Sequence, residues 1–292
     1  MFERLPLPPL IVRNYVFEWG ARTFIMGIVN ATPDSFSGDG IYADTAAAVR
    51  RAIDIAEAGA DIIDIGGEST RPGHEPVSET EELHRVIPVV AAIRRAVELP
   101  ISIDTFKPAV AVEALSVGAD IINCVWGAIP GIVELAARSG AALIVVHNRV
   151  NAEYDSDCVN EVIGSLELAT RYARDSGVAA EKIIADPGIG FGKTPDHNVQ
   201  IIGRLSEFAS RLPYPLLVGA SRKSFIGKIT GLPVGERLFG TAAACALSIA
   251  GGADIVRVHD VAEMRSVVDV ADAICRVGAA RAPERLPMRF PS

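Results

Sequence analysis

The sequence predicts an α/β protein whose fold class is a (β/α)8 TIM barrel, formed as a single domain over residues 23–278. Two observations support this fold class. Short apolar, β-branched segments alternate with amphipathic segments along most of the 292 residues. In addition, one local pattern recurs, as AGADIIDIGG at 58, VGADIINCVWG at 117, SGAALIVVHN at 139 and GGADIVRVHD at 251.

The recurring pattern marks the junction between a helix and the strand that follows it. Its glycine suits the position just after a helix, where the backbone takes a positive φ that other residues avoid. The apolar run after the glycine suits a strand that is buried on both faces, as in a parallel sheet. Each copy therefore predicts the end of one helix and the start of the next strand.

The other apolar runs bring the number of predicted strands to eight, which is the number a closed barrel requires. We expect the strands at Phe24–Ala31, Asp61–Gly67, Ile101–Thr105, Ile121–Val125, Ala142–His147, Ile183–Asp186, Leu216–Ala220 and Ile255–His259. Amphipathic helix candidates between them begin at Thr45, Ser78, Lys107 and Gly235. Ser78 and Glu81 have the spacing of a capping box at a helix start.

A doubly wound open sheet is the alternative for alternating strands and helices. That fold usually has a GxGxxG turn after its first strand, whereas GIVNATPDSF follows here. Residues 1–22 alternate weakly between apolar and polar, and we expect a hairpin that caps the bottom of the barrel. The aperiodic tail, residues 279–292, is expected to be disordered.

Composition excludes several classes of partner. The net charge of −8 argues against nucleic acid or an anionic membrane as a partner bound by bulk electrostatics. No apolar run approaches the length of a membrane span, and MFERLPLPPL lacks the pattern of a signal peptide. The four cysteines are far apart and form no CxxC pair, which favours a reduced, cytoplasmic protein without a zinc site. A local cationic pocket can still bind a small anionic substrate.

Polar side chains gather where the predicted strands end, which is the active-site end of a barrel. A single Asn or Asp there often only begins a turn or caps a helix. Here nearly every strand ends in a polar or ionisable residue, so the sequence indicates a site. The set is Asn30, Asp104, Asn123, His147, Asp186, Lys223, Arg257 and His259, and the second strand runs into GGESTRPG.

Two cationic donors interrupt the apolar run ADIVRVHDV of the last strand. Because side chains alternate between the faces of a strand, Arg257 and His259 point to one side and Val256 and Val258 to the other. An arginine is rarely buried without a partner. Gly219 and Lys223 also share a face, so three cationic donors are expected at the barrel mouth, where they suit a polar, anionic ligand.

Six motifs resemble the dihydropteroate synthase family in order and spacing, over roughly residues 24–270. They are MGIVNATPDSFSGDG, DIIDIGGESTRPG, ISIDTFKP, DPGIGFGK, GASRKSFIG and RVHD. The resemblance implies a cytoplasmic transferase of folate biosynthesis that condenses 6-hydroxymethyl-7,8-dihydropterin diphosphate with 4-aminobenzoate, releasing pyrophosphate. It also implies a pterin-binding TIM barrel that uses Mg²⁺, forms a homodimer and is a target of sulfonamides.

Site residues follow from this resemblance position by position. It implies that the pterin binds to Asp104, Asn123, Asp186, Gly219 and Lys223. The diphosphate is implied to bind to Asn30, Arg257 and His259, and the metal ion, Mg²⁺, to Asn30. The implied 4-aminobenzoate subsite is formed by Thr70, Arg71, Pro72, Phe191, Lys223 and Ser224. Asp104, Lys223 and Arg257 are the expected catalytic residues.

General chemistry supports these implied roles. A carboxylate and a lysine match the donors and acceptors along one edge of a pterin. Arginine, histidine and Mg²⁺ stabilise the negative charge of a departing diphosphate. The N–H groups at the start of the segment that follows Lys223 suit the carboxylate of 4-aminobenzoate.

The chain departs from the family pattern at three places. Asn123-Cys124 stands where Asn-Asp is usual, Ser37–Gly40 differs from the common order of the first loop, and Val146 stands where a methionine often packs against the pterin. Alternation turns Cys124 away from the face of Asn123, which predicts a small buried hydrophobe rather than a reactive thiol. The loops at 31–40 and 67–75 are expected to be mobile lids.

Three alternative functions stay open on the sequence. A methyltetrahydrofolate-binding methyltransferase-type barrel shares the pterin pocket but has no need for Lys223 or for Arg257 and His259. A non-catalytic pterin-binding paralogue would keep the contacts without turnover. A Schiff-base aldolase that uses Lys223 is disfavoured, because SRKSF places the lysine beyond the strand end beside a second cation.

Overall fold

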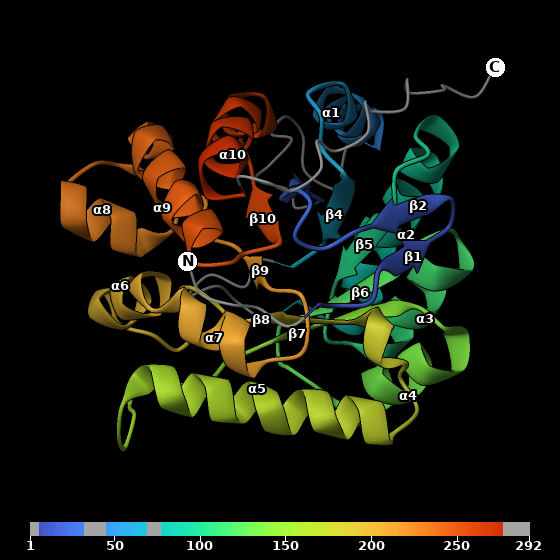
Figure 1. The fold of residues 1–292 in the computed structure, drawn as a ribbon. Helices are drawn as coiled ribbons and strands as arrows, with labels where there is room; N and C mark the ends of the chain where they lie inside the picture. Colours follow the sequence, from blue (N-terminus) through green and yellow to red (C-terminus); the bar gives the residue numbers. More distant parts are fainter. Residues whose placement is uncertain (1–5, 32–44, 69–76, 277–292) are drawn as a thin grey trace.

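Eight parallel strands form a closed barrel that helices surround (Figure 1). The computed structural model describes residues 6–31, 45–68 and 77–276. The barrel strands are β3 (Phe24–Asn30), β4 (Ile62–Gly66), β5 (Ile101–Asp104), β6 (Ile121–Cys124), β7 (Ala142–Val146), β8 (Ile183–Asp186), β9 (Leu217–Val218) and β10 (Ile255–Val258).

Closure of the sheet excludes the doubly wound alternative. The strand order is β8-β7-β6-β5-β4-β3-β10-β9, so the first barrel strand pairs with the last. Between β8 and β9 a parallel bridge joins Ala185 to Leu216, and the Ala185 N–H donates to the Pro215 carbonyl at 2.9 Å. No edge of this sheet is left open, which confirms the predicted (β/α)8 barrel.

The predicted strands are mostly one to three residues too long. Ala31, Thr105, Val125, His147 and Ala220 lie beyond the observed strand ends. The observed strands are shorter because the chain leaves the hydrogen-bonded sheet where it begins to line the barrel mouth. The seventh predicted strand, Leu216–Ala220, keeps only β9 and the bridge at Leu216.

The helices lie between consecutive strands, as predicted. They are α1 (Thr45–Glu57), α2 (Glu79–Ala96), α3 (Pro108–Ser116), α4 (Pro130–Ser139), α5 (Cys158–Asp175), α6 (Pro195–Gly203), α7 (Leu205–Arg211), α8 (Ser224–Thr230), α9 (Leu238–Ala250) and α10 (Val261–Cys275). In the described part of the chain, 3-10 turns lie at Ala180–Lys182 and Val234–Glu236. None of the helices in the described ranges combines the length and apolar character that crossing a bilayer requires.

The recurring glycine pattern takes the predicted backbone conformation. Gly59, Gly118, Gly140 and Gly252 all have positive φ, between 72° and 116°. Each ends the segment that leads from a helix into a barrel strand. The start of α2 also follows the sequence, since the Ser78 hydroxyl accepts a hydrogen bond from the Glu81 N–H at 3.2 Å.

Apolar side chains fill the lower part of the barrel, at the starts of the strands. An antiparallel hairpin of β1 (Leu10–Val12) and β2 (Tyr15–Phe17) contributes to this cluster. Its members include Leu10, Val12 and Phe17 of the hairpin and Phe24, Ile62, Ile121, Leu217 and Ile255 of the strands. The starts of the strands are therefore closed by apolar contacts, which leaves the opposite end for polar groups. The predicted tail, 279–292, lies outside the described residues.

Candidate active site

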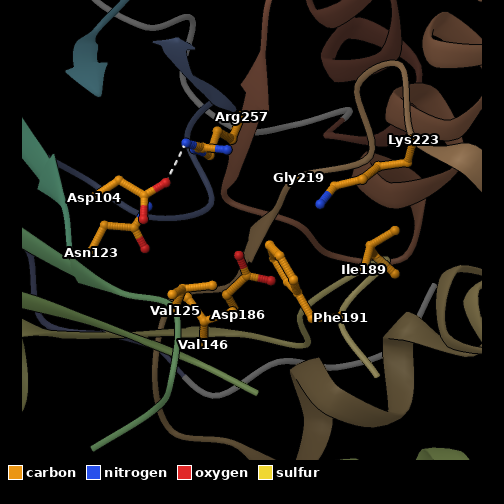
Figure 2. A pocket seen from close by; sticks show the side chains of 10 residues that line it. All are labelled: Asp104, Asn123, Val125, Val146, Asp186, Ile189, Phe191, Gly219, Lys223 and Arg257. Carbon is orange, nitrogen blue, oxygen red and sulfur yellow. Dashed lines mark hydrogen bonds and ion pairs between the residues drawn. The ribbon is translucent and has the colours of Figure 1, made fainter. Parts of the chain in front are cut away.

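A pocket lies at the carboxyl ends of the barrel strands, where the sequence predicts the site (Figure 2). Side chains point into it from β5, β6, β8, β10 and the segments that follow β8 and β9. Its lining is Asp104, Asn123, Val125, Val146, Asp186, Ile189, Phe191, Gly219, Lys223 and Arg257. The free space is about 20 Å³, so a ring-sized ligand requires a long lining side chain such as Lys223 to move.

Two carboxylates hold the guanidinium of Arg257. Its Nε donates to Asp64 Oδ2 at 2.6 Å and its Nη2 to Asp104 Oδ2 at 2.7 Å. The Asn123 side-chain amide also donates to Asp64, at 3.3 Å. Burial alone would lower the pKa of Arg257, but Asp64 and Asp104 raise it above its ordinary value. The cation that interrupts the last strand is thus paired across the interior of the barrel.

Asp64 is a member of this site that the sequence reasoning missed. Its side chain is fully buried in β4, between apolar neighbours on the chain. The signal was present in IIDIG, because alternation places Asp64 on the same inward face as Ile62. A buried carboxylate requires a partner, and Arg257 supplies it from the far end of the sequence.

Burial shifts the titration of the two pocket carboxyls. It raises the pKa of Asp104 to about 7, although the nearby Arg257 acts in the opposite direction. It raises the pKa of Asp186 to about 6, against the lowering effect of the Gly188 N–H, which donates to Asp186 Oδ1 at 2.7 Å. Near neutral pH each of these two carboxyls is therefore easier to protonate than an ordinary aspartate. Each can accept a hydrogen bond from a ligand when ionised and donate one when protonated.

A tight turn brings Lys223 to the pocket from beyond β9. Arg222, just before it, has a positive φ of 57°, which is unusual for a residue with a side chain. The turn is held by the Arg222 Nε, which donates to Asp260 Oδ2 at 2.9 Å, and by the Arg222 N–H, which donates to the Thr241 hydroxyl at 3.0 Å. The Lys223 ammonium then lies 3.9 Å from the centroid of the Phe191 ring.

Of the predicted residues that the structure describes, four lie outside the pocket lining, namely Asn30, His147, Ser224 and His259. Asn30 is partly buried at the end of β3, and Ser224 is exposed at the start of α8. The His259 Nδ1 lies 3.0 Å from the Ser221 hydroxyl, a partner that the sequence reasoning did not identify. Thr70, Arg71 and Pro72, the altered segment Ser37–Gly40 and most of both expected lid loops lie outside the described residues.

The other two departures from the family pattern have different locations. Val146 lines the pocket together with Val125, so it occupies the wall where the sequence places it. Cys124 is fully buried among apolar side chains on the helix side of the sheet, and burial raises the pKa of its thiol to about 12. The predicted face of Cys124 is thus confirmed, and its thiol is a buried apolar group rather than a nucleophile.

A second, larger cleft of about 560 Å³ lies next to this pocket. It is formed by the segments after β6 and β7 and by α5, and Val146 is the residue that lines both. Of the predicted site residues, His147 lines this cleft, and none of the residues implied to bind the pterin, the diphosphate or 4-aminobenzoate does. Convergence of ionisable groups, rather than volume, therefore identifies the candidate active site.

The sequence of this chain is similar to that of known pterin-binding enzymes. A sequence profile described as "Pterin binding enzyme" matches residues 26–259. A dihydropteroate synthase of Synechocystis is 48% identical over 278 residues, which cover 92% of this chain and 96% of the relative. The dihydropteroate synthase of Bacillus subtilis is 45% identical over 259 residues, which cover 88% of this chain and 90% of the relative.

Solved structures agree with these matches. A dihydropteroate synthase of Clostridium difficile, crystallised in the presence of pteroic acid, has a TM-score of 0.86 at 44% identity and covers 89% of this chain and 99% of its own. A dihydropteroate synthase of Burkholderia cenocepacia, complexed with 7,8-dihydropteroate, has a TM-score of 0.83 at 40% identity and covers 92% of this chain and 96% of its own.

Proposed function

The chain belongs to the pterin binding enzyme family, and we infer from this membership that it catalyses the dihydropteroate synthase reaction. It is a transferase of folate biosynthesis that condenses 6-hydroxymethyl-7,8-dihydropterin diphosphate with 4-aminobenzoate to 7,8-dihydropteroate and pyrophosphate. One structural observation carries this conclusion. Asp104, Asn123, Asp186, Lys223 and Arg257, from five separate segments, line a single pocket at the barrel mouth.

A turnover experiment tests the activity directly. The protein is incubated with labelled 4-aminobenzoate, the pterin diphosphate and Mg²⁺, and dihydropteroate and pyrophosphate are measured. Formation of both products in equal amounts is the expected result. Pterin binding in calorimetry without any product would identify a non-catalytic pterin-binding protein. Methyl transfer from methyltetrahydrofolate would instead support the methyltransferase-type alternative.

We propose that the pterin ring binds to Asp104, Asn123, Asp186, Gly219 and Lys223. The state of Asn123 supports this assignment, because its side-chain Oδ1 is buried and has no hydrogen-bond partner among the described residues. An unpaired buried acceptor is costly, and a ring N–H or amino group of a pterin would satisfy it. Asp186 accepts the Gly188 N–H through Oδ1, which leaves Oδ2 for the ring.

We propose that the diphosphate binds to Arg257, Asn30 and His259. A guanidinium carries five N–H groups, and the bonds to Asp64 and Asp104 use only two of them. Arg257 can therefore donate to a diphosphate oxygen while both carboxylates keep its orientation. Asn30 is the last residue of β3 and His259 follows β10, and these strands are neighbours in the sheet, so both residues lie on the same side of the mouth.

Magnesium is part of the same proposal. The side-chain oxygen of Asn30 is a ligand type that this hard cation accepts, and one protein oxygen suffices where substrate phosphates and water complete the shell. When bound, the ion would offset the negative charge that develops on the departing diphosphate. A chelator is expected to abolish turnover, and added Mg²⁺ is expected to restore it. Full activity in the presence of a chelator would contradict the proposal.

The rest of the proposed catalysis consists of holding the two reactants in position. The bond between the pterin methylene carbon and the diphosphate oxygen breaks, and pyrophosphate leaves with the electron pair. The amino nitrogen of 4-aminobenzoate forms the new C–N bond and releases a proton. An arylamine is already neutral at pH 7, so the protein needs no strong base. Arg257 stabilises the leaving group, while the pocket holds the two reactants in contact.

We propose that 4-aminobenzoate binds beside the pterin, at Phe191, Lys223 and Ser224. The contact between the Lys223 ammonium and the Phe191 ring supports this subsite, because it places an aromatic wall and a cation at the edge of the pocket. The cation suits the carboxylate of 4-aminobenzoate, and the ring suits its aryl group. Thr70, Arg71 and Pro72 complete the proposed subsite from the second loop.

We further propose that the chain forms a homodimer through α8, the turn after it and α9, which lie together on one flank of the barrel (Figure 1). Large apolar side chains are exposed there, namely Ile229, Leu232, Val234, Phe239 and Leu247. Phe239 alone is 86% exposed. In a sedimentation experiment the wild type is expected to be a dimer and Phe239→Glu a monomer. A monomeric wild type would contradict the proposal.

The cytoplasm is the proposed location. All four cysteines are free thiols, and three of them are buried. This state fits a reducing compartment, where disulfides do not persist. Fractionation of cells that express the chain with a tag would test the assignment, with recovery in the soluble cytoplasmic fraction as the expected result.

A further inference from the structure

The loop after β8, residues 187–193, lies directly against the end of β7. Two glycines allow this contact. A Cβ on Gly188 would lie 1.8 Å from the His147 carbonyl oxygen, and one on Gly192 would lie 2.3 Å from the Arg149 carbonyl oxygen. Both glycines also have positive φ. The loop therefore runs backbone against backbone along the segment that follows β7, and its path is tightly constrained.

Lys193 fixes the end of this loop with its ammonium group. The Nζ lies 2.8 Å from His147 Nδ1, 2.9 Å from the Phe191 carbonyl oxygen and 3.4 Å from the His147 carbonyl oxygen. An ammonium has three N–H donors and no acceptor, so these three acceptors satisfy it completely. Lys193 is thus bonded at once to the carbonyl of Phe191 and to two groups of His147, at the end of β7.

The contact with Lys193 determines which ring nitrogen of His147 carries the proton. Burial lowers the pKa of Lys193 to about 7, and below that pH the group is an ammonium that only donates. The imidazole then accepts through an unprotonated Nδ1 and carries its single proton on Nε2. Burial and the charges of Lys193 and Arg149 lower the pKa of His147 to about 3, which keeps the ring neutral. Tyr154 stacks on this ring with centroids 6.5 Å apart.

Further bonds hold the other residues of the loop. The Tyr154 hydroxyl donates to the Gly192 carbonyl at 3.0 Å, and the Gly190 N–H donates to Asn198 Oδ1 at 2.6 Å. The Phe191 N–H donates to the Gly188 carbonyl at 3.1 Å. Both backbone groups of Phe191 are therefore engaged, so the direction in which its ring leaves the backbone is fixed.

We propose that Lys193 is a positioning residue for the 4-aminobenzoate subsite, acting with neutral His147 to hold Phe191 in place beneath Lys223. This inference rests on the proposed function, which assigns Phe191 to that subsite. Lys193 does not line the pocket, so its effect on the reaction passes through the backbone of Phe191. Loss of the ammonium removes three hydrogen bonds at once, including the one to the Phe191 carbonyl, and allows the Phe191 ring to shift.

Kinetics of Lys193→Met provide the main test. We expect the KM for 4-aminobenzoate to rise about tenfold, which is the effect of losing roughly one charged hydrogen bond. The KM for the pterin diphosphate should change less than about twofold, because Asp104 and Asn123 lie on other strands and Asp186 keeps its bond from the Gly188 N–H. The Lys193 charge is the smallest of the effects on the pKa of Asp186. Equal changes in both KM values, or no change in either, would overturn the proposal.

The matched control is Lys182→Met. The Lys182 ammonium also donates to a backbone carbonyl, that of Ile11 at 2.5 Å, but on the hairpin at the opposite end of the barrel. This variant should leave both KM values unchanged. If it raised the KM for 4-aminobenzoate as Lys193→Met does, the effect of Lys193→Met would reflect general destabilisation and the positioning role would be rejected.

A spectroscopic test is independent of turnover. In ¹⁵N-histidine NMR spectra, His147 should show an unprotonated Nδ1 and a protonated Nε2, with its signal assigned by its absence in His147→Gln. In Lys193→Met the two tautomers should mix. If the wild type formed no dihydropteroate but showed this tautomer, the proposed function would fail while the Lys193–His147 contact stood. The spectra are recorded below pH 7, where Lys193 is an ammonium, and a protonated Nδ1 in the wild type there would reject the contact itself.

Tyr154→Phe keeps the proposal testable should Lys193→Met not fold. The substitution removes only the hydroxyl that donates to Gly192 and keeps the ring that stacks on His147. We expect a smaller rise in the KM for 4-aminobenzoate, about two- to fivefold, again without a change for the pterin diphosphate. An unaltered KM for 4-aminobenzoate in a folded Tyr154→Phe protein would contradict the positioning role.

Discussion

Replacement of Arg257 by methionine tests whether the paired charges inside the barrel stabilise the fold. Methionine keeps most of the volume of the side chain but removes the guanidinium. Asp64 is fully buried, and it would retain only the longer contact from the Asn123 amide, at 3.3 Å. Asp104 would lose its bond from Nη2 at the same time. The substitution therefore leaves two carboxyls near each other without a cation between them.

The expected loss is large. Removing one partner of a buried ion pair costs about 3–5 kcal/mol, because the remaining charge is neither solvated nor paired. We expect Arg257→Met to lower the free energy of unfolding at pH 7 by that amount. The double variant Asp64→Asn with Arg257→Met should lose less than Arg257→Met alone, since no unpaired charge remains at position 64.

Urea unfolding followed by far-UV circular dichroism measures these differences. Arg211→Met is the matched control, because its guanidinium pairs with Glu167 at 3.1 Å on the surface, where the two side chains are 41% and 35% exposed. This control should lose less than about 1 kcal/mol. If Arg257→Met lost no more than the control, or if adding Asp64→Asn recovered nothing, the idea of a stabilising buried pair would be refuted.

Three further predictions concern the pocket and its surroundings. Asp186→Asn should weaken pterin binding in calorimetry by about 1.5–3 kcal/mol, since a carboxylate acceptor is lost, and an unchanged affinity would remove Asp186 from the site. Burial raises the folded-state pKa of Asp104 to about 7 from 3.8, so the folded protein binds more protons than the unfolded chain between these values. Stability should therefore fall as pH rises from about 4 to about 7, and Asp104→Asn should flatten this dependence in urea unfolding across that range. An equally steep dependence in the variant would contradict the assignment. Cys124→Ser should keep most of the activity, and a thiol reagent should label Cys124 slowly in the folded protein. Rapid labelling that pterin blocks would show that the thiol faces the pocket.

Local sequence determined the order and the kind of the structural elements. Apolar β-branched runs predict buried strands wherever they occur, and Gly59 or Gly118 marks a helix end because few other residues tolerate a positive φ. Alternation along a strand was enough to separate Asn123, which faces the pocket, from Cys124, which faces the helices. These are properties of neighbouring residues, so no knowledge of the distant chain is needed to infer them.

Strand lengths and the positions of loop residues were predicted less well. The strand expected at Leu216–Ala220 is shorter in the structure, because the chain turns early through Arg222 to bring Lys223 to the pocket. Lys193 reads in the sequence as one more polar residue of DPGIGFGK. Its role depends on His147, which lies 46 positions earlier and meets it only when β7 and β8 pair.

The charge pairing inside the barrel could be decided only by the tertiary structure. The sequence indicated that Arg257 requires a partner, but Asp64 lies 193 positions away and Asp104 lies 153 positions away. Closure of the sheet places β10 beside β3, and β3 lies beside β4, so the two ends of the sequence meet across one barrel. A side chain can be assigned to a face from its neighbours on the chain, but its partner depends on which strands are adjacent in space.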